Sequence, residues 1–241
     1  MFMRLNRFIG DYDVFAPEMD ITDEAVVHQL SKVLRMQPGQ KIVICDGKGR
    51  EALASILSID KKMVSVTLDR VTELQNEPER EIVLYCSIIK KELFDLVVQK
   101  ATEVGVREII PLLSTRTIKQ DLKIDRIRLI TKEAAEQSGR GFIPLIHEPM
   151  KWHTAMDHAK DNLVNLFFHV TEKGDGIPQG FKKKIGIWIG PEGGWDDEEV
   201  NEAKKANFLI AELGPLTLRA ETAAIVASYL TVHGQIKNPS V

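Results

Sequence analysis

From residue 82 onward, short apolar segments alternate with segments of helical pattern, and this alternation restricts the fold more than any other feature of the sequence. The apolar segments are rich in β-branched residues and bounded by glycine or polar residues, as strands are. Strands that alternate with helices are typical of a parallel sheet covered on both faces. The sequence therefore predicts an α/β fold with strands at 82–89, 106–113, 163–169, 185–189 and 208–213, and helices at 92–104, 121–138, 196–206 and 220–233.

Residues 1–74 have a different pattern. Short β-like segments occur at 7–9, 41–45, 51–56 and 63–68, and they are interrupted by one amphipathic helix with Thr22 as its expected N-cap. This part of the chain is predicted to form a small β-barrel with a helix. A polar, proline-containing stretch at 75–80 reads as a linker. We expect two domains, residues 1–74 and 75–241.

Two strand–turn–helix segments near the C-terminus carry glycine in their turns. The first contains Gly-Pro-Glu-Gly-Gly at 190–194, and the second contains Leu-Gly-Pro at 213–215. Loops that leave the carboxyl ends of strands in an open α/β sheet form the usual ligand crevice. Pro191 removes an N–H donor and Glu192 adds negative charge, so a neutral or cationic ligand fits better than a phosphate. The alternative is a simple turn before a helix capped by Asp196 and Glu199.

Four ordered motifs, the last of them in two segments, resemble one enzyme family. The segments G-P-E-G-G-W at 190–195 and L-R-A-E-T-A at 218–223 are similar to the C-terminal motifs of the SPOUT class of RNA methyltransferases. More narrowly, they resemble the bacterial enzymes that methylate N3 of a uridine in 16S rRNA. The other matching segments are H-x-L-x-x-V-L-R at 28–35, Q-K-A-T-E-V-G-V at 99–106 and E-Q-S-x-R at 136–140.

The resemblance implies an N-terminal PUA-like RNA-binding β-barrel domain and a C-terminal SPOUT methyltransferase domain with a trefoil knot. It also implies S-adenosyl-L-methionine as methyl donor, uridine 1498 of 16S rRNA in the small ribosomal subunit as target, and a homodimer with a shared active site. The chain departs from the family pattern at Leu216, where a basic residue is common. Alternatives are a SPOUT enzyme acting on tRNA or another rRNA position, and a non-catalytic RNA-binding assembly factor.

The expected site residues fall into three groups. Arg219 is the candidate for stabilising a uracil anion, because a guanidinium can pair with a carbonyl as negative charge grows. Its alternative role is a salt bridge to Glu221, which is itself a possible base. The cofactor-binding candidates are His169, Gly190, Glu192, Gly193, Gly194, Leu213, Gly214 and Leu218. The RNA-binding candidates are Arg7, Lys32, Arg35, Arg116 and Arg140.

Composition limits the remaining possibilities. The formal net charge is −3, so overall charge does not indicate nucleic-acid binding, and any RNA contact has to be local. The two cysteines, Cys45 and Cys86, lie in apolar strand-like segments, and the six histidines show no metal-ligand spacing, so no metal site is expected. No segment resembles a signal peptide or a transmembrane helix, and we expect a cytoplasmic enzyme.

Overall fold

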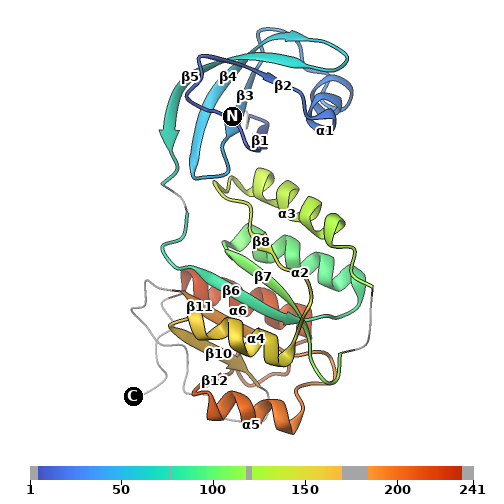
Figure 1. Ribbon diagram of the computed structural model, residues 1–241, viewed down its shortest axis with the longest axis vertical. Coiled ribbons are helices and arrows are strands. Elements are labelled where there is room, and N and C mark those ends of the chain that lie inside the picture. Colours follow the sequence, from blue (N-terminus) through green and yellow to red (C-terminus); the bar gives the residue numbers. More distant parts are fainter. Residues whose placement is uncertain (1–4, 76, 118–120, 170–183, 235–241) are drawn as a thin grey trace. The chain divides into compact units, whose positions relative to one another are not determined.

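The computed structural model describes residues 5–75, 77–117, 121–169 and 184–234, and Figure 1 shows its helices and strands. The chain divides into two compact units. The first unit contains Met1–Glu77 and Ala135–Ile143, and the second contains Pro78–Ala134 and Pro144–Val241. The segment at 135–143, which the sequence assigns to the second domain, therefore groups with the first unit.

The first unit contains a five-stranded sheet in the order β1-β3-β4-β5-β2. Strand β1 is parallel to β3, and the other pairs are antiparallel. Apolar residues of the sheet, among them Phe8 and Ile42, pack with Leu30 of the helical segment in one core. The strands are β1 (Arg7–Ile9), β2 (Glu18–Ile21), β3 (Lys41–Cys45), β4 (Arg50–Ile59) and β5 (Val64–Glu73).

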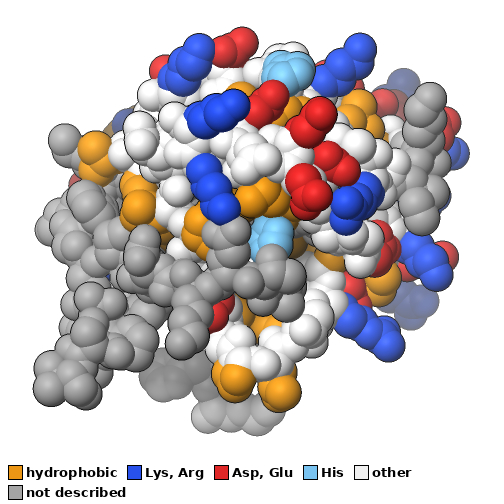
Figure 2. All heavy atoms as spheres, turned by 90° about the horizontal axis from the view of Figure 1, so that it is seen from below, with side chains coloured by type: hydrophobic (Ala, Val, Ile, Leu, Met, Phe, Trp, Pro, Cys, Tyr) orange, Lys and Arg blue, Asp and Glu red, His pale blue; other side chains and the backbone are white. Residues whose placement is uncertain are grey.

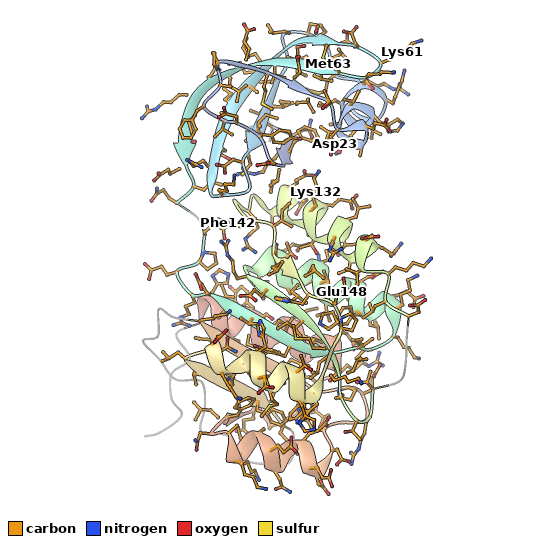
Figure 3. All side chains as sticks on the ribbon, viewed as in Figure 1. Asp23, Lys61, Met63, Lys132, Phe142 and Glu148 are labelled. Carbon is orange, nitrogen blue, oxygen red and sulfur yellow. The ribbon has the colours of Figure 1, made fainter. Side chains whose placement is uncertain are left out.

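Helix α1 (Glu24–His28) begins one residue later than the sequence predicts. Its N-cap is Asp23 rather than Thr22, and the Asp23 carboxylate accepts hydrogen bonds from two backbone N–H groups of the first turn. Figure 3 labels Asp23 at this end of the helix. A carboxylate there also interacts favourably with the helix dipole. The helix continues into a π-helical turn, η1 (Gln29–Val33), and Arg35 then has a positive φ of 51°.

Residues 135–143 complete the first unit. Nε of Arg140 donates to both carboxylate oxygens of Glu77, at 3.0 and 3.1 Å, and the backbone N–H of the following residue donates to the same carboxylate at 2.6 Å. Phe142, labelled in Figure 3, packs so closely over Gly49 that a Cβ at Gly49 would lie 3.1 Å from the Phe142 ring. The polar stretch predicted as a linker thus contains Glu77, the half-buried partner of the buried Arg140.

The second unit contains a parallel sheet, as the sequence predicts. Its strand order is β12-β10-β11-β6-β7-β8, with β9 also paired to β7, and every pair is parallel. Along β6, Ile82 and Leu84 pack in one apolar cluster while Val83 and Tyr85 pack in another. The sheet is therefore buried on both faces. The strands are β6 (Ile82–Ser87), β7 (Glu108–Leu113), β8 (Leu145–Ile146), β9 (Met150–Lys151), β10 (Val164–Phe168), β11 (Ile185–Ile189) and β12 (Leu209–Ala211).

Helices contribute to both clusters (Figure 1). Residues of α2, α3 and α6 pack in the first cluster, and residues of α4 and α5 pack in the second. The helices are α2 (Lys91–Val104), α3 (Ile124–Ser138), α4 (Trp152–His158) with the 3-10 turn η2 (Ala159–Asp161), α5 (Asp197–Lys205) and α6 (Ala220–His233). The sequence predicts all of them except α4 and its following turn.

Both cysteines are free and buried. Burial raises the pKa of Cys86 to about 12, so its thiol is held in the unreactive protonated form. Among the described helices, none combines the length and the apolar character that a membrane crossing demands.

Candidate active site

The two glycine-bearing loops leave one edge of the parallel sheet. Strands β10, β11 and β12 are parallel, with β10 between the other two. Their carboxyl ends, Phe168, Ile189 and Ala211, therefore lie at the same edge, which we call the carboxyl edge. The loops at 190–196 and 212–219 flank the end of β10.

The 190–194 loop is a tight turn with an open side. The Gly194 N–H donates to the Pro191 carbonyl at 2.9 Å, and Gly194 has a φ of +70°. No atom lies within 4 Å of the position that a Cβ would occupy at Gly194. Gly194, Gly193 and Glu192 are all exposed. At Gly193 and Gly194 the turn therefore exposes backbone to a ligand that binds at this edge.

Trp195 anchors that loop to the sheet. Its indole N–H donates to the carbonyl of Phe168, the last residue of β10, at 2.9 Å, and its ring stacks on Phe167. A Cβ at Gly190 would lie only 3.0 Å from the Trp195 ring. Glycine at 190 is therefore explained by the packing of Trp195, independently of any ligand.

A capping box starts the helix after the loop, as predicted. The Asp196 carboxylate accepts a hydrogen bond from the backbone of Glu199, and the Glu199 carboxylate accepts one from the Asp196 N–H, at the start of α5. Glu199 is buried, and its carboxylate also accepts a hydrogen bond from the Thr115 N–H at 2.8 Å. Arg116 donates to the Gly193 carbonyl at 3.1 Å and pairs with Asp196 at 3.3 Å. The segment after β7 thus holds the glycine loop through Arg116, whose predicted contact with RNA stays a prediction.

The 212–219 loop carries a second open glycine. Gly214 has a φ of +103°, and no atom lies within 4 Å of its missing Cβ position. Leu213 and Leu218, the predicted adenine-contacting residues, are half-buried, whereas Leu216 is 77% exposed. His169 is half-buried, and its backbone N–H donates to the Ala211 carbonyl at 3.2 Å, which extends the pairing of β10 with β12.

The two predicted catalytic residues differ in exposure. Arg219 is the N-cap residue of α6 and is exposed, and its side chain makes no capping hydrogen bond. Glu221 lies in the first turn of the same helix and is 8% exposed. In the described parts of the chain no ion pair joins these two residues. Within the part of the chain that the structure describes, the helix-entry salt bridge that was the alternative role for Arg219 is therefore not formed.

The remaining RNA-binding candidates divide into two pairs. Lys32 and Arg35, at the end of the helical segment of the first unit, are exposed. Arg7 pairs with Glu51, and its side chain is 12% exposed. Arg140 is buried against Glu77, as described above. Paired side chains with so little exposure offer little surface to a phosphate, and we therefore expect Arg7 and Arg140 to contribute mainly to the stability of the first unit.

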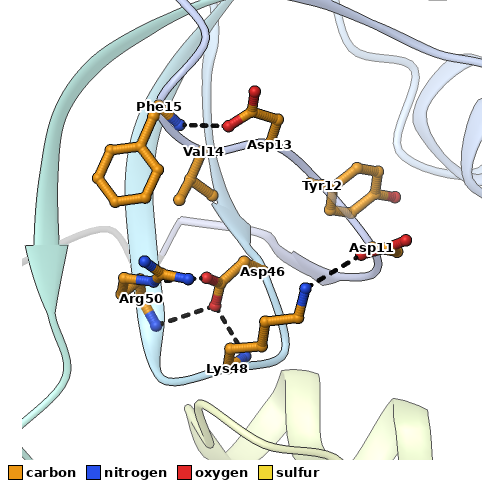
Figure 4. Close-up of a pocket in the computed structure, with 8 residues that line it drawn as sticks. All are labelled: Asp11, Tyr12, Asp13, Val14, Phe15, Asp46, Lys48 and Arg50. Carbon is orange, nitrogen blue, oxygen red and sulfur yellow. Dashed lines mark hydrogen bonds and ion pairs between the residues drawn. The ribbon is translucent and has the colours of Figure 1, made fainter.

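Sequence reasoning did not anticipate a pocket of about 330 Å³ in the first unit (Figure 4). The Arg50 guanidinium lies 4.9 Å from the centre of the Phe15 ring, which is 63% exposed. Burial opposes ionisation of Asp46, but hydrogen bonds from the backbone N–H groups of Lys48 and Arg50 and from the Arg50 side chain outweigh it and hold the pKa of Asp46 below its usual value. The only related signal in the sequence is the glycine turn at 46–49.

Charge is mixed over the face seen in Figure 2, where acidic and basic side chains are interspersed among the described residues. This agrees with the net charge of −3. On such a protein, RNA has to be contacted by a few basic residues at particular positions.

Comparison with known proteins follows the same division of the chain. A family model described as an RNA methyltransferase domain matches residues 75–231, and one described as an RNA methyltransferase PUA domain matches residues 21–69. A protein of Mesomycoplasma hyopneumoniae named ribosomal RNA small subunit methyltransferase E is 39% identical over 62% of this chain and 68% of its own length. Its namesake from Rickettsia conorii is 31% identical over 93% of this chain and 94% of its own.

A solved structure has the same fold over nearly the whole chain. It is the ribosomal RNA small subunit methyltransferase E of Neisseria gonorrhoeae, bound to S-adenosyl methionine. It is 28% identical to this chain, with a TM-score of 0.86, and the match covers 95% of this chain and 98% of that one.

Proposed function

The chain belongs to the RNA methyltransferase family, and from this membership we propose that it transfers a methyl group from S-adenosyl-L-methionine to N3 of a uridine in 16S rRNA of the small ribosomal subunit. The proposed target is uridine 1498, the position implied by the motif resemblance. The observation that carries the proposal is the carboxyl edge, where two open glycine turns flank the end of β10.

The residues of this edge fit the methyl donor. Gly194 and Gly214 both have positive φ and open space where a side chain would stand, so backbone groups can approach a nucleoside closely. The half-buried Leu213 and Leu218 supply apolar contacts for adenine. The exposed Glu192 carboxylate is compatible with a cationic sulfonium and would repel a phosphate. When bound, S-adenosylmethionine supplies an electrophilic methyl group.

The N-cap residue of α6 and a residue of its first turn are the proposed catalytic groups. The exposed Arg219 guanidinium has no carboxylate partner among the described residues, and its fork is free to pair with a uracil carbonyl as N3 loses its proton. Glu221 is the candidate acceptor for that proton, since its carboxylate is buried without an ion-pair partner in the described structure. Deprotonated N3 then forms the new bond to the methyl carbon as the bond from carbon to sulfur breaks.

Lys32 and Arg35 are the proposed phosphate contacts in the first unit. Replacing both by alanine should weaken RNA binding and lower its dependence on salt, because each lost phosphate contact reduces the number of released counterions. Lys61 and Lys62, exposed on the turn between β4 and β5, are the matched control pair. Equal losses for the two double variants would contradict the assignment.

We also propose a homodimer. Tyr229 of α6 is 54% exposed, although most residues of that helix are apolar. A large aromatic side chain on the outer face of such a helix is suited to an interface between copies. Analytical ultracentrifugation tests this, and a monomer with full activity at its working concentration would rule out a shared active site.

The whole proposal has one direct test. The protein is incubated with isotope-labelled S-adenosylmethionine and small ribosomal subunits that lack the modification, and the methylated nucleotide is mapped by mass spectrometry. Label on N3 of uridine 1498 supports the proposal. Label on another nucleotide would overturn the target, and cofactor binding without transfer would indicate a non-catalytic assembly factor.

A further inference from the structure

Three metal-ligand side chains meet at the opposite edge of the parallel sheet, which we call the amino edge. Glu108 is the first residue of β7, His147 directly follows β8, and His158 is the last residue of α4. One ligand atom from each lies within 4.8 Å of the others. The three positions are 39 and 11 residues apart in the sequence, so linear spacing gives no indication of this cluster.

The distances suit a small tetrahedral cation. Nε2 of His147 lies 3.0 Å from Oε2 of Glu108, and Nε2 of His158 lies 3.8 Å from the same oxygen. Ligand atoms at zinc bond lengths in a tetrahedron are separated by about 3.4 Å. Both observed separations are within about half an ångström of that value, so small side-chain shifts would bring the ligands to bonding positions.

Neighbouring groups orient the ligand atoms. The Tyr85 hydroxyl lies 2.7 Å from Nδ1 of His158 and accepts a hydrogen bond from Asn162 at 3.0 Å. The Lys184 ammonium lies 2.8 Å from Oε1 of Glu108. These contacts engage Nδ1 of His158 and Oε1 of Glu108, and they leave Nε2 and Oε2 facing each other. Outer contacts of this kind are typical of metal sites, where they fix the ring and carboxylate orientation.

We propose that Glu108, His147 and His158 bind one Zn²⁺ ion, with water in the fourth position. Each side chain is about one-fifth exposed, at 18%, 19% and 21%, so solvent can reach a fourth ligand. Two histidines, one carboxylate and a water are an established zinc ligand set. Because the cluster joins β7, the residue after β8 and the end of α4, the ion links one strand that the sequence predicts to two elements that it does not.

Lys184 is the group that opposes a cation here. Its ammonium forms an ion pair with the same carboxylate that the metal would bind. The metal ion and the ammonium would therefore repel each other. If the cluster binds metal, Lys184→Gln removes that repulsion and tightens binding. If the cluster is only an ion-pair network, the same substitution removes the Lys184 ammonium from that network and has no effect on metal binding.

Cobalt is the probe for the first test. The full-length protein is stripped with a chelator, dialysed and titrated with Co²⁺, whose tetrahedral complexes absorb visible light far more strongly than the hydrated ion. We expect saturation at one equivalent and bleaching of the absorption by one equivalent of Zn²⁺. His147→Gln and His158→Gln should lose the absorption, whereas His153→Ala should keep it, because His153 is exposed and pairs with Glu202 outside the cluster.

Circular dichroism and cofactor binding verify that each variant is folded. The same titrations measured for Lys184→Gln should give several-fold tighter binding than for the wild type. The site would be overturned by a featureless cobalt spectrum of the folded wild type. It would also be overturned if the His147→Gln and His158→Gln variants gave the same cobalt spectrum as the wild type. Neither result bears on methyl transfer, because the proposed transfer site lies at the other edge of the sheet.

Discussion

The two edges of the parallel sheet differ in the groups they present: exposed backbone at one edge, and paired side chains at the other. At the carboxyl edge, Gly194 and Gly214 expose backbone in left-handed conformations, and Arg219 extends without an ion pair among the described residues. At the amino edge, side chains such as Glu108 and His158 close on one another through hydrogen bonds and ion pairs. An edge that is open at the backbone can bind a large ligand, while an edge closed by side chains can hold an ion or stabilise the fold.

Among the substitutions that test this comparison, those at Arg219 should have the largest effect, a loss of methyl transfer. Arg219→Ala should cut methyl transfer by about a hundredfold while folding and cofactor binding stay nearly unchanged, since a preorganised charge contact is lost. Arg219→Lys should restore little, because an ammonium does not reproduce the guanidinium fork. Single-turnover transfer of labelled methyl groups measures both variants.

The wild-type rate should also rise with pH as more uracil N3 is deprotonated. Full turnover in the alanine variant would move the chemistry away from Arg219. Circular dichroism and a cofactor titration serve as its folding controls.

Gly194 is expected to have the next largest effect. Gly194→Val places a branched side chain at a φ of +70° and in the open space of the loop, at a strain cost of about 1–3 kcal/mol. Cofactor affinity should fall by at least about tenfold, as measured by calorimetry. Gly39→Val is the matched control, because Gly39 has a φ of +85° and equally open surroundings in the first unit. If Gly39→Val and Gly194→Val lowered the cofactor affinity equally, backbone strain alone would be responsible for the loss.

Two buried indoles compare the carboxyl edge with the sheet core, at smaller magnitude. Trp195 donates to the Phe168 carbonyl at the carboxyl edge, and Trp188 donates to the Asn165 amide oxygen at 3.1 Å within the sheet core. Trp195→Phe should lower the free energy of unfolding by about 1–3 kcal/mol, since a buried carbonyl loses its indole donor. Trp188→Phe should lower it by about 1 kcal/mol, since the Asn165 oxygen keeps a hydrogen bond from Asn162 at 2.8 Å.

Only Trp195→Phe should also weaken cofactor binding, because it releases the glycine loop from β10. Thermal unfolding and cofactor titration are measured on both proteins. A loss of affinity in Trp188→Phe as large as in Trp195→Phe would remove the distinction.

Arg116 should give the smallest effect. It is half exposed, at 46%, and joins Gly193 to Asp196, so Arg116→Ala should cost less than about 1 kcal/mol of stability. Cofactor affinity should fall by less than about fivefold. Arg128→Ala is the control, since Arg128 is similarly exposed and also pairs with two other residues, both acidic, away from the loop. An unchanged affinity for Arg116→Ala would mean that the capping box alone positions the loop.

The sequence predicts the type of fold well because the main strands are continuous apolar segments. The buried strand β6 and the helices α2 and α6 fall close to their predicted positions. Strands β8 and β9 contain two residues each, too few for a periodic pattern, and they were missed. The trefoil knot remains a prediction, since no local pattern encodes how a chain threads.

The candidate site was predictable only where its residues lie in local motifs. The capping box of Asp196 and Glu199 is visible in the sequence because its members are three positions apart. The partners of Arg7 and Arg140 are 44 and 63 residues away, and such pairing decides whether an arginine can contact RNA. Exposure of this kind depends on tertiary packing, which single-sequence patterns do not report.

The segment at 135–143 has a consequence for how the protein is made. The chain enters the first unit, leaves it after Glu77, and returns for these residues before finishing in the second unit. During synthesis, the carboxylate of Glu77 therefore emerges from the ribosome long before the Arg140 guanidinium that neutralises it. The N-terminal unit reaches its final packing only after more than half of the protein has been translated, so its maturation is tied to the progress of the unit that follows it.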